Sequence, residues 1–348
     1  IRELAAQVAA HGVKRITGRV LVDATFFPSG NRELGTDVVM SPIVVNDNLV
    51  DLMVGPGATI GAPAVIAPAP VTSYLRIVNR VTTGAKNSKA NIAFGLDTAD
   101  AAGLHTLTVT GTTPAGGPPV LYAYRVPDPA RFAEVTLTEA LKERGVAAGQ
   151  NGAARPDFTA MRASYTPDRV VAEHVSPPLR EDVRITLKVS QNLHASMTPR
   201  IVKATLAPDD TSKTGFDLEH DFLTKAGLDL SGAQQADGAG GDAHFTPAFM
   251  VSYLAYMIHQ KDSAIFRASL PILGRDGTLW NIQPSSPAAG HVMAKTGTFA
   301  NYDPLNRRLL ITGKGLAGYI DTADHRRLAF AIYVNNVSVS TDPDDATA

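Results

Sequence analysis

The sequence predicts an α+β protein, in which a strand-rich first half is followed by helices and then by a last group of strands. Between residues 71 and 124, short β-branched and aromatic runs alternate with Gly, Pro and Asn turns. From Pro177 onward helical apolar spacing predominates, until strand-like runs return after residue 291. Helices and strands that are segregated along the chain in this way are typical of an α+β fold.

The first 70 residues predict one helix and several extended pieces. Residues 2–10 have apolar side chains at helical spacing, and Gly12 stands where such a helix would stop. Residues 16–22 predict a strand, and residues 43–54 predict extended pieces that end at a Gly-Pro-Gly turn. The Ala- and Pro-rich residues 62–70 are interpreted as a linker.

The remaining elements are predicted from the spacing of apolar residues and from the Gly and Pro residues at which helices and strands begin or end. Residues 74–78, 106–110 and 120–124 predict strands of a small β domain. Pro129 opens a helix that Gly145 ends. Further on, the pattern predicts a helix over 249–259 and strands over 292–298, 316–320 and 328–334.

Composition narrows the function classes. The 348 residues carry 32 Lys and Arg against 33 Asp and Glu, a balance that argues against nucleic-acid binding. Cysteine is absent, which excludes disulfides, thiolate metal sites and cysteine nucleophiles. No run approaches the roughly 18 apolar residues of a membrane span. The first residues lack a signal-peptide profile and the chain does not start with Met, so we expect it to be a fragment.

Two tripeptides are candidates for chemistry, Ser190-Gln191-Asn192 between two predicted helices and Lys295-Thr296-Gly297 on a predicted strand. Each is weak alone, and a polar turn between helices is the plain alternative for the first. The chain holds an internal comparison, because residues 213–215 are also Lys-Thr-Gly; their acidic surroundings favour a solvated loop. The later copy fits a strand whose edge can pair with an extended peptide.

Peptide acyl transfer explains why such residues would be needed. It requires a nucleophile, a proton acceptor, donors for the oxyanion and a clamp for the substrate. Ser190 can relay a proton to the leaving amine, and the Asn192 amide can hold a lysine and the substrate backbone. Lys295 and the Thr296 hydroxyl can bind a terminal carboxylate, while Gly297 lets the substrate approach the strand closely.

In their surroundings these tripeptides resemble those of the class C, low-molecular-mass penicillin-binding proteins, which are D-alanyl-D-alanine carboxypeptidases and endopeptidases. That group is marked by S-x-x-K, an S-D-N-type tripeptide and K-T-G. The matching stretches keep the family's order over about residues 11–335 and lie at 12–27, 41–48, 126–129, 190–193, 237–240, 273–279, 294–298 and 316–319.

The resemblance implies a penicillin-binding transpeptidase (β-lactamase-like) domain with nested β-rich inserted domains. Residues 1–65 and 125–175 would form one insertion, 66–124 a second inside it, and 176–348 the C-terminal part of the transpeptidase domain. It further implies a periplasmic or otherwise extracytoplasmic enzyme that cuts peptidoglycan stem peptides through an acyl-serine that β-lactam antibiotics trap, with no metal or organic cofactor. Ser190, Asn192 and Lys295 would be catalytic, and Thr296, Gly297 and Thr298 would bind substrate.

One departure is large: no serine in the chain has lysine three positions later, so the S-x-x-K motif is missing. We expect that motif upstream of Ile1. Two alternatives stay open. A non-catalytic peptidoglycan-binding or scaffolding relative would keep Lys295 as a carboxylate clamp. A class A β-lactamase-like hydrolase is disfavoured, because that compact fold has no place for the long β-rich stretch before Ser190.

Smaller departures concern single positions. Gln191 replaces the commoner middle residue, Ala239 stands where the family usually has serine, and about a dozen extra residues, 302–313, separate the Lys-Thr-Gly strand from the next. Asp37 is a candidate for binding the stem peptide, although an acidic loop residue is usually only solvated. Asp237 is expected to shape a turn. The histidines at 194, 220, 244 and 291 have no metal-ligand spacing.

Overall fold

The computed structural model describes residues 1–149 and 155–340. The described residues fall into two compact units, one of Ile1–Glu33 with Asp37–Val175 and one of Leu34–Thr36 with the residues from Ser176 onward. The nested insertions and their predicted limits at residues 65 and 124 stay a prediction.

The first unit consists mainly of strands. Its elements are α1 (Arg2–Ala10), β1 (Arg15–Arg19), a 3₁₀ turn (Asn46–Asn48), β2 (Leu49–Gly55), β3 (Val65–Ala69), β4 (Leu75–Gly84), β5 (Asn91–Ala99), β6 (His105–Pro114), β7 (Val120–Arg125), α2 (Pro129–Glu143), β8 (Ala147–Gly149), α3 (Phe158–Met161) and 3₁₀ turns at Arg162–Ser164 and Pro167–Arg169.

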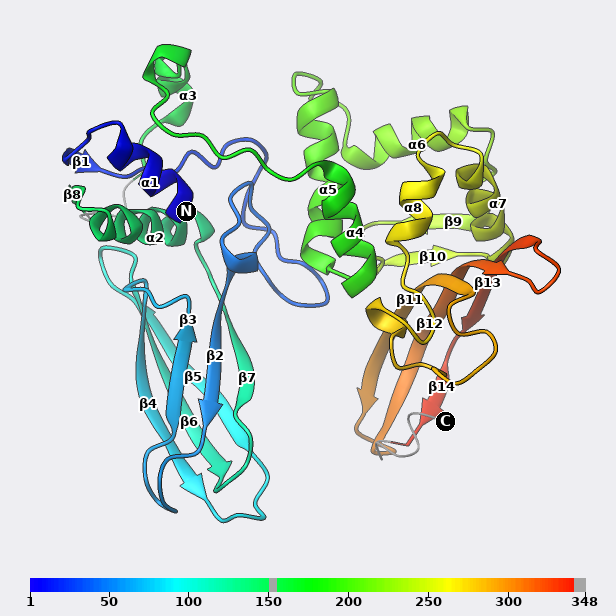
Figure 1. Ribbon diagram of the computed structural model, residues 1–348, viewed down its shortest axis with the longest axis horizontal. Helices are drawn as coiled ribbons and strands as arrows, with labels where there is room; N and C mark the ends of the chain where they lie inside the picture. The colour runs from blue at the N-terminus through cyan, green and yellow to red at the C-terminus, as the bar shows by residue number, and fades with distance from the viewer. Residues whose placement is uncertain (150–154, 341–348) are drawn as a thin grey trace. The chain divides into compact units, whose positions relative to one another are not determined.

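Two three-stranded sheets, ordered β3-β2-β7 and β4-β6-β5, form the body of this unit (Figure 1). Along β2 the side chains of Val50, Leu52 and Val54 are buried in one core with Leu107 and Val109 of β6. This alternation is what a strand with one buried face requires, and each buried Val or Leu contributes about 1.5–3 kcal/mol.

Helix α2 covers one end of these sheets. It starts where Asp128 accepts a hydrogen bond from Arg131 N at 3.0 Å and Pro129 occupies the first turn. Phe132 packs into the core of the two sheets, while Leu141 packs in a second cluster with residues of α1. The predicted helices at residues 2–10 and from Pro129 are confirmed.

The interpretation of residues 62–70 as a linker is wrong. Val65–Ala69 is strand β3, which pairs antiparallel with β2 from Asp51 to Gly55. Proline in a strand argues against pairing, but β3 lies at the edge of its sheet, where a missing N–H is tolerated at Pro68.

The second unit joins helices to one larger sheet. Its elements are α4 (Leu179–Val189), α5 (Asn192–Leu206), α6 (Gly215–Lys225), a 3₁₀ turn (Leu230–Gly232), β9 (Ala233–Gln235), β10 (Ala243–Phe245), α7 (Pro247–Ile258), α8 (Ser263–Ser269), a 3₁₀ turn (Gly277–Leu279), β11 (Val292–Asp303), β12 (Arg308–Asp321), β13 (Arg327–Val334) and β14 (Val337–Val339).

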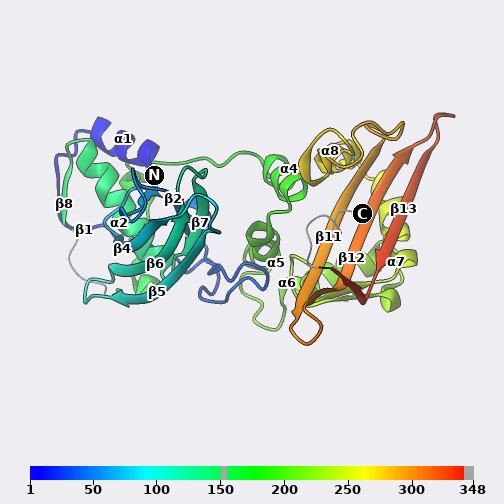
Figure 2. The same ribbon diagram turned by 90° about the horizontal axis from the view of Figure 1, so that it is seen from below.

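The sheet is antiparallel with the order β11-β12-β13 (Figure 2), and β14 pairs with the start of β12. One face carries Tyr319, which packs with Leu254 of α7 and whose hydroxyl donates to the Leu254 carbonyl at 2.8 Å. The other face is covered near β11 by Leu273 and Leu279. The sheet is therefore held between a helix and a loop segment, and β11 forms one edge of it.

The loop predicted at the first Lys-Thr-Gly is confirmed for Lys213 and Thr214, whereas Gly215 already begins α6. Thr214 caps that helix by a reciprocal pair of bonds with Asp217. Residues 302–313 do not separate the strands, because β11 and β12 stay paired to Asp303 and Arg308. Within the described residues, no helix has both the length and the apolar character needed to cross a membrane.

Candidate active site

The junction of α4 and α5 fixes Ser190. Helix α4 ends at Val189, and Ser190 takes a left-handed conformation with φ 59° and ψ 54°. The Thr186 carbonyl accepts from Ser190 N and from Gln191 N, and the Gln191 side chain in turn caps α5 by accepting from Leu193 N at 3.1 Å. A left-handed residue other than glycine costs about 1–2 kcal/mol. The turn therefore fixes the position of the Ser190 hydroxyl, and its strained backbone lowers the free energy of unfolding.

Lys295 on β11 meets this hydroxyl. Its Nζ donates to Ser190 Oγ at 2.7 Å and to the Thr296 carbonyl oxygen at 2.6 Å. Burial of the ammonium lowers the pKa of Lys295 to about 8, because desolvation disfavours the charged form. The two tripeptides, 105 residues apart in sequence, thus share a hydrogen bond in the folded chain.

The residues after Lys295 are open to an approaching chain. Gly297 and Thr298 are exposed, and a Cβ built on Gly297 would meet no atom within 4 Å. The Thr296 hydroxyl lies 2.9 Å from the hydroxyl of Thr278, in the 3₁₀ turn Gly277–Leu279. Two hydroxyls and one partly buried ammonium form a donor set suited to a carboxylate.

A segment at residues 271–279 supports β11 from outside. Leu273 N donates to the Val292 carbonyl and Ala294 N donates to the Pro271 carbonyl, both at 2.9 Å. Asp276 anchors this segment to α4, because Lys188 Nζ lies 2.8 and 2.7 Å from its two carboxylate oxygens. This ion pair joins the helix that ends at Ser190 to the loop that carries Thr278.

Sequence reasoning assigned no role to Thr278, Lys188 or Asp276. Thr278 and Asp276 lie in residues 273–279, one of the stretches that carry the family resemblance. That resemblance could have marked both residues as candidates for the site. Lys188 stands two residues before Ser190, with no pattern that marks its partner.

Two predicted site residues are not brought into this network. Asn192 is the first residue of α5 and is half-buried, and no side-chain hydrogen bond joins it to another described residue. Asp37 belongs to the first unit, where its carboxylate pairs with Arg32 at 3.2 Å. The roles predicted for both stay predictions.

Asp237 shapes a turn, as expected. Its carboxylate accepts from Ala239 N at 2.7 Å, from Gly240 N at 2.8 Å and from Asp242 N. A Cβ at Gly238 would lie 2.2 Å from the Ala195 carbonyl, so the turn packs closely on α5. Ala239, where the family usually has serine, takes part in the turn through its backbone.

The comparison copy of Lys-Thr-Gly has a different environment. Lys213 is exposed and pairs with Asp221 at 2.6 Å. A Cβ at Gly215 would lie 2.0 Å from the Pro199 carbonyl, so that glycine is needed for packing against α5.

Among the described residues there is also no cluster of His, Asp and Glu able to hold a metal ion.

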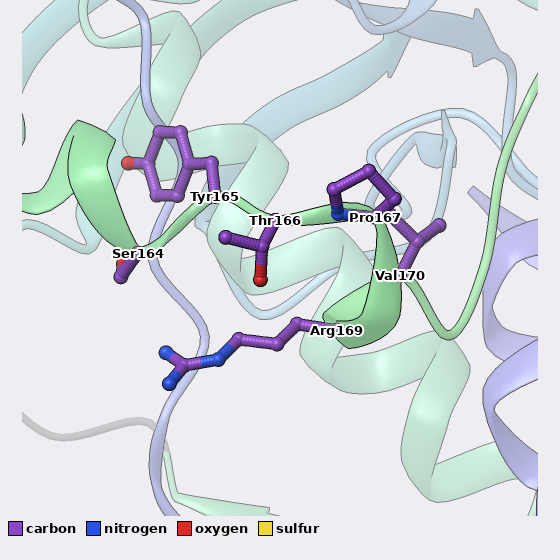
Figure 3. Close-up of a pocket in the computed structure, with 6 residues that line it drawn as sticks. All are labelled: Ser164, Tyr165, Thr166, Pro167, Arg169 and Val170. Carbon is purple, nitrogen blue, oxygen red and sulfur yellow. The ribbon is translucent and has the colours of Figure 1, made fainter.

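An open pocket in the first unit lies on a different segment, the one that follows α3 (Figure 3). Ser164, Thr166, Pro167 and Val170 line it together with Tyr165, whose hydroxyl donates to Asp23, and with Arg169. It combines no nucleophile with a base, so the geometry of Ser190 and Lys295 is the stronger candidate for chemistry.

Comparisons with known proteins identify the family of this chain. The model of the D-Ala-D-Ala carboxypeptidase 3 (S13) family matches residues 1–348. A D-alanyl-D-alanine carboxypeptidase of Actinomadura sp. (strain R39) is 28% identical over 357 residues, which cover 96% of this chain and 62% of that protein. The chain thus spans about three-fifths of the length of this curated relative.

Solved structures give the same fold. Penicillin-binding protein 4 of Haemophilus influenzae matches with a TM-score of 0.71 and 19% identity, over 98% of this chain and 74% of that one. The same protein in complex with a β-lactam matches with a TM-score of 0.66 and 18% identity, over 96% and 71%. The predicted α+β fold, with a portion of a penicillin-binding transpeptidase domain, is confirmed by this likeness.

Proposed function

This chain belongs to the D-Ala-D-Ala carboxypeptidase 3 (S13) family, and we propose that it supplies the carboxylate clamp and proton relay of a serine-type D-Ala-D-Ala carboxypeptidase. The observation that carries the proposal is the 2.7 Å hydrogen bond between Lys295 Nζ and Ser190 Oγ. Each tripeptide alone is only a weak indication of function. The hydrogen bond brings the two together as one set of donors beside an open strand edge.

The proposed substrate is a peptidoglycan stem peptide that ends in D-Ala-D-Ala. Its terminal carboxylate would bind the Lys295 ammonium and the Thr296 hydroxyl, which are the donors nearest to the open surface at Gly297. A carboxylate beside Lys295 favours the charged ammonium, so substrate binding would raise the pKa of Lys295 above about 8.

The proposed reaction needs a nucleophile that these 348 residues do not carry in an S-x-x-K motif. A serine supplied by residues outside this chain would attack the carbonyl carbon of the penultimate D-Ala. The base that accompanies this serine would take up the serine's proton. As the C–N bond breaks, Ser190 would accept that proton from the base and pass its own hydroxyl proton to the leaving D-alanine nitrogen, while Lys295 keeps its hydrogen bond to Ser190 Oγ. Water would then cleave the ester and release the shortened peptide.

Related assignments follow from the same proposal. β-lactams would acylate the same serine, as a β-lactam complex is known for the Haemophilus protein. The enzyme would work outside the cytoplasm, where peptidoglycan is found. The non-catalytic alternative remains a competing hypothesis, because the missing motif is what it would explain.

Release of D-alanine from an acetylated peptide ending in D-Ala-D-Ala tests the proposal on the full-length gene product. Lys295→Ala should lower kcat/KM at least about 100-fold, because it removes the clamp and the partner of Ser190. Lys213→Ala is the matched control from the other Lys-Thr-Gly and should leave kcat/KM unchanged, since Lys213 makes only an exposed ion pair. Equal losses in the two variants, or no release by the unmodified protein, would contradict the proposal.

A further inference from the structure

The sheet β4-β6-β5 of the first unit has two faces of different chemistry (Figure 1). Leu107 and Val109 of β6 are buried in the core that this sheet shares with β3-β2-β7. Side chains alternate along a strand, so the residues between and beside these two lie on the opposite face. They are Thr106, Thr108 and Thr110. A row of hydroxyls therefore follows the central strand on the side that is turned away from the core.

Two arginines of β4 stand beside this row. Arg76 pairs in register with Thr106, and Arg80 pairs in register with Thr110. Their neighbours Leu75 and Val81 are buried in the core, so the two arginine side chains lie on the threonine face. Arg76, Arg80 and the three threonines are named here the basic threonine face.

Both guanidinium groups are available to a ligand. Arg76 and Arg80 are exposed, and among the residues that the structure describes no carboxylate pairs with either one. The four residues between them advance about 13 Å along the strand. Two unpaired cations at this separation attract anionic groups that are carried on one extended molecule.

Acidic residues are absent from this part of the sequence. Between Asp51 and Asp97 the chain holds no Asp or Glu, whereas it holds four basic residues, Arg76, Arg80, Lys86 and Lys89. Both lysines are exposed in the connection from β4 to β5. The positive charge of the face is thus continued along β4 and into the following turn.

The acidic residues that follow are bound within the unit. Asp97 on β5 accepts from the Tyr124 hydroxyl at 2.8 Å and lies 2.9 Å from His105 Nδ1. Asp100 accepts from Ala102 N at 2.8 Å and from Leu104 N at 3.0 Å in the turn before β6. Neither carboxylate neutralises the arginines of β4.

A ligand of this surface must lie on the face and not along the edge of β4. That edge is taken near Val81, because Ala64 N donates to the Val81 carbonyl and Thr83 N donates to the Ala62 carbonyl, both at 2.9 Å. An acidic peptide that is added as a strand has no free run of backbone groups to pair with there. Threonine hydroxyls both donate and accept, as sugar hydroxyls do, and guanidinium groups bind carboxylates with two parallel hydrogen bonds.

We propose that the basic threonine face binds an acidic polysaccharide, with sugar carboxylates on Arg76 and Arg80 and sugar hydroxyls on the threonines beside them. A single sugar can reach only one guanidinium, whereas a chain of several sugars can reach both. The proposal is independent of the proposed function, because none of these residues belongs to the candidate active site.

The test measures binding of galacturonic acid and of its linear eight-sugar oligomer to the full-length gene product by calorimetry. We expect the oligomer to bind at least about tenfold more tightly than the single sugar, because only the oligomer spans the two arginines. Binding should weaken as salt is raised, since both cations are exposed.

Two variants locate the binding. The double variant Arg76→Ala/Arg80→Ala should weaken oligomer binding at least about tenfold. Its matched control is Arg2→Ala/Arg326→Ala, which removes the same charge at two exposed arginines outside the face and should change binding less than about twofold.

A third variant tests the threonines. Thr108→Val keeps the shape of the side chain and removes its hydroxyl, so it should weaken oligomer binding about threefold. Unchanged binding in this variant would overturn the role of the threonine row.

The remaining outcomes decide the proposal as a whole. Absence of oligomer binding, or equal losses in the two double variants, would overturn it. Poly-L-glutamate of the same charge is the comparison for an acidic protein, and we expect it to bind at least about tenfold more weakly than the oligomer. Equal or tighter binding of poly-L-glutamate would show a surface for acidic proteins and would overturn the polysaccharide assignment.

Discussion

At the scale of single residues, Lys295 combines two properties that oppose each other. Its ammonium is partly withdrawn from water and donates to a hydroxyl and a carbonyl oxygen, and within the described residues no carboxylate pairs with it. The charged form is therefore disfavoured until an anion arrives. Under the proposed function, that anion is the carboxylate of the substrate.

The KM for a D-Ala-D-Ala peptide should therefore depend on pH. Lys295 has a pKa of about 8, so the free site is charged below that pH and loses its charge above it. The substrate carboxylate stays ionised, so KM should rise by up to about tenfold per pH unit above pH 8. In Lys295→Arg the guanidinium stays protonated, and the rise should vanish up to pH 10. A KM that is constant from pH 6 to 10 in the unmodified protein would refute this role.

Ser190 should show a conflict between stability and activity. Ser190→Ala and Ser190→Gly both remove the hydroxyl that Lys295 contacts, so both should lose at least about 100-fold in kcat/KM. Only glycine relieves the left-handed backbone at φ 59°. The glycine variant should therefore be more stable than the alanine variant by about 0.5–1 kcal/mol. Chemical denaturation measures the difference, and equal stabilities would argue against strain at this turn.

At the scale of elements, the site depends on how α4, β11 and the segment 271–279 are held together. Lys188 and Asp276 form the link, and Asp276 also accepts from Ile272 N at 2.8 Å. The segment in turn occupies the β11 edge before Lys295 and carries Thr278. Removing the Asp276 carboxylate should therefore loosen both the helix that ends at Ser190 and the segment that carries Thr278.

Asp276→Asn should lower the free energy of unfolding by about 1–2 kcal/mol, because it leaves the partly buried Lys188 without a counter-charge. It should also lower kcat/KM about tenfold as Thr278 and the strand edge lose their support. Asp221→Asn breaks the exposed pair with Lys213 and is the control, with an expected change within about 0.5 kcal/mol. Similar effects of the two substitutions would show that the Asp276 pair has no special role.

Several elements were predictable from sequence because their pattern is local. The helix Arg2–Ala10 and the strands that contain residues 292–298, 316–320 and 328–334 follow from apolar period alone. Strand β3 was missed because Pro68 is acceptable only at a sheet edge, which sequence does not reveal. The start of α6 had a readable signal, the Thr214 and Asp217 capping pair, which the Lys-Thr-Gly pattern obscured.

At the scale of the whole molecule, the candidate site is formed by residues that lie far apart in the sequence. The pair of Ser190 and Lys295 was predictable as a resemblance, whereas Thr278 and the Lys188 to Asp276 link depend on how a loop folds back on β11. Residues 302–313 were expected to separate two strands, and the pairing of Asp303 with Arg308 shows that most of them prolong the two strands instead. Pairing of this kind depends on register, which a single sequence specifies only weakly.

We propose that this chain is the clamp and relay portion of a serine enzyme whose nucleophile is supplied by residues outside these 348. The test is intact-mass spectrometry after incubation with a penicillin, on the full-length gene product and on the 348-residue chain in parallel. We predict a mass gain of one β-lactam on the full-length protein and none on the 348-residue chain. An adduct on the 348-residue chain, or no adduct on either protein, would contradict the claim.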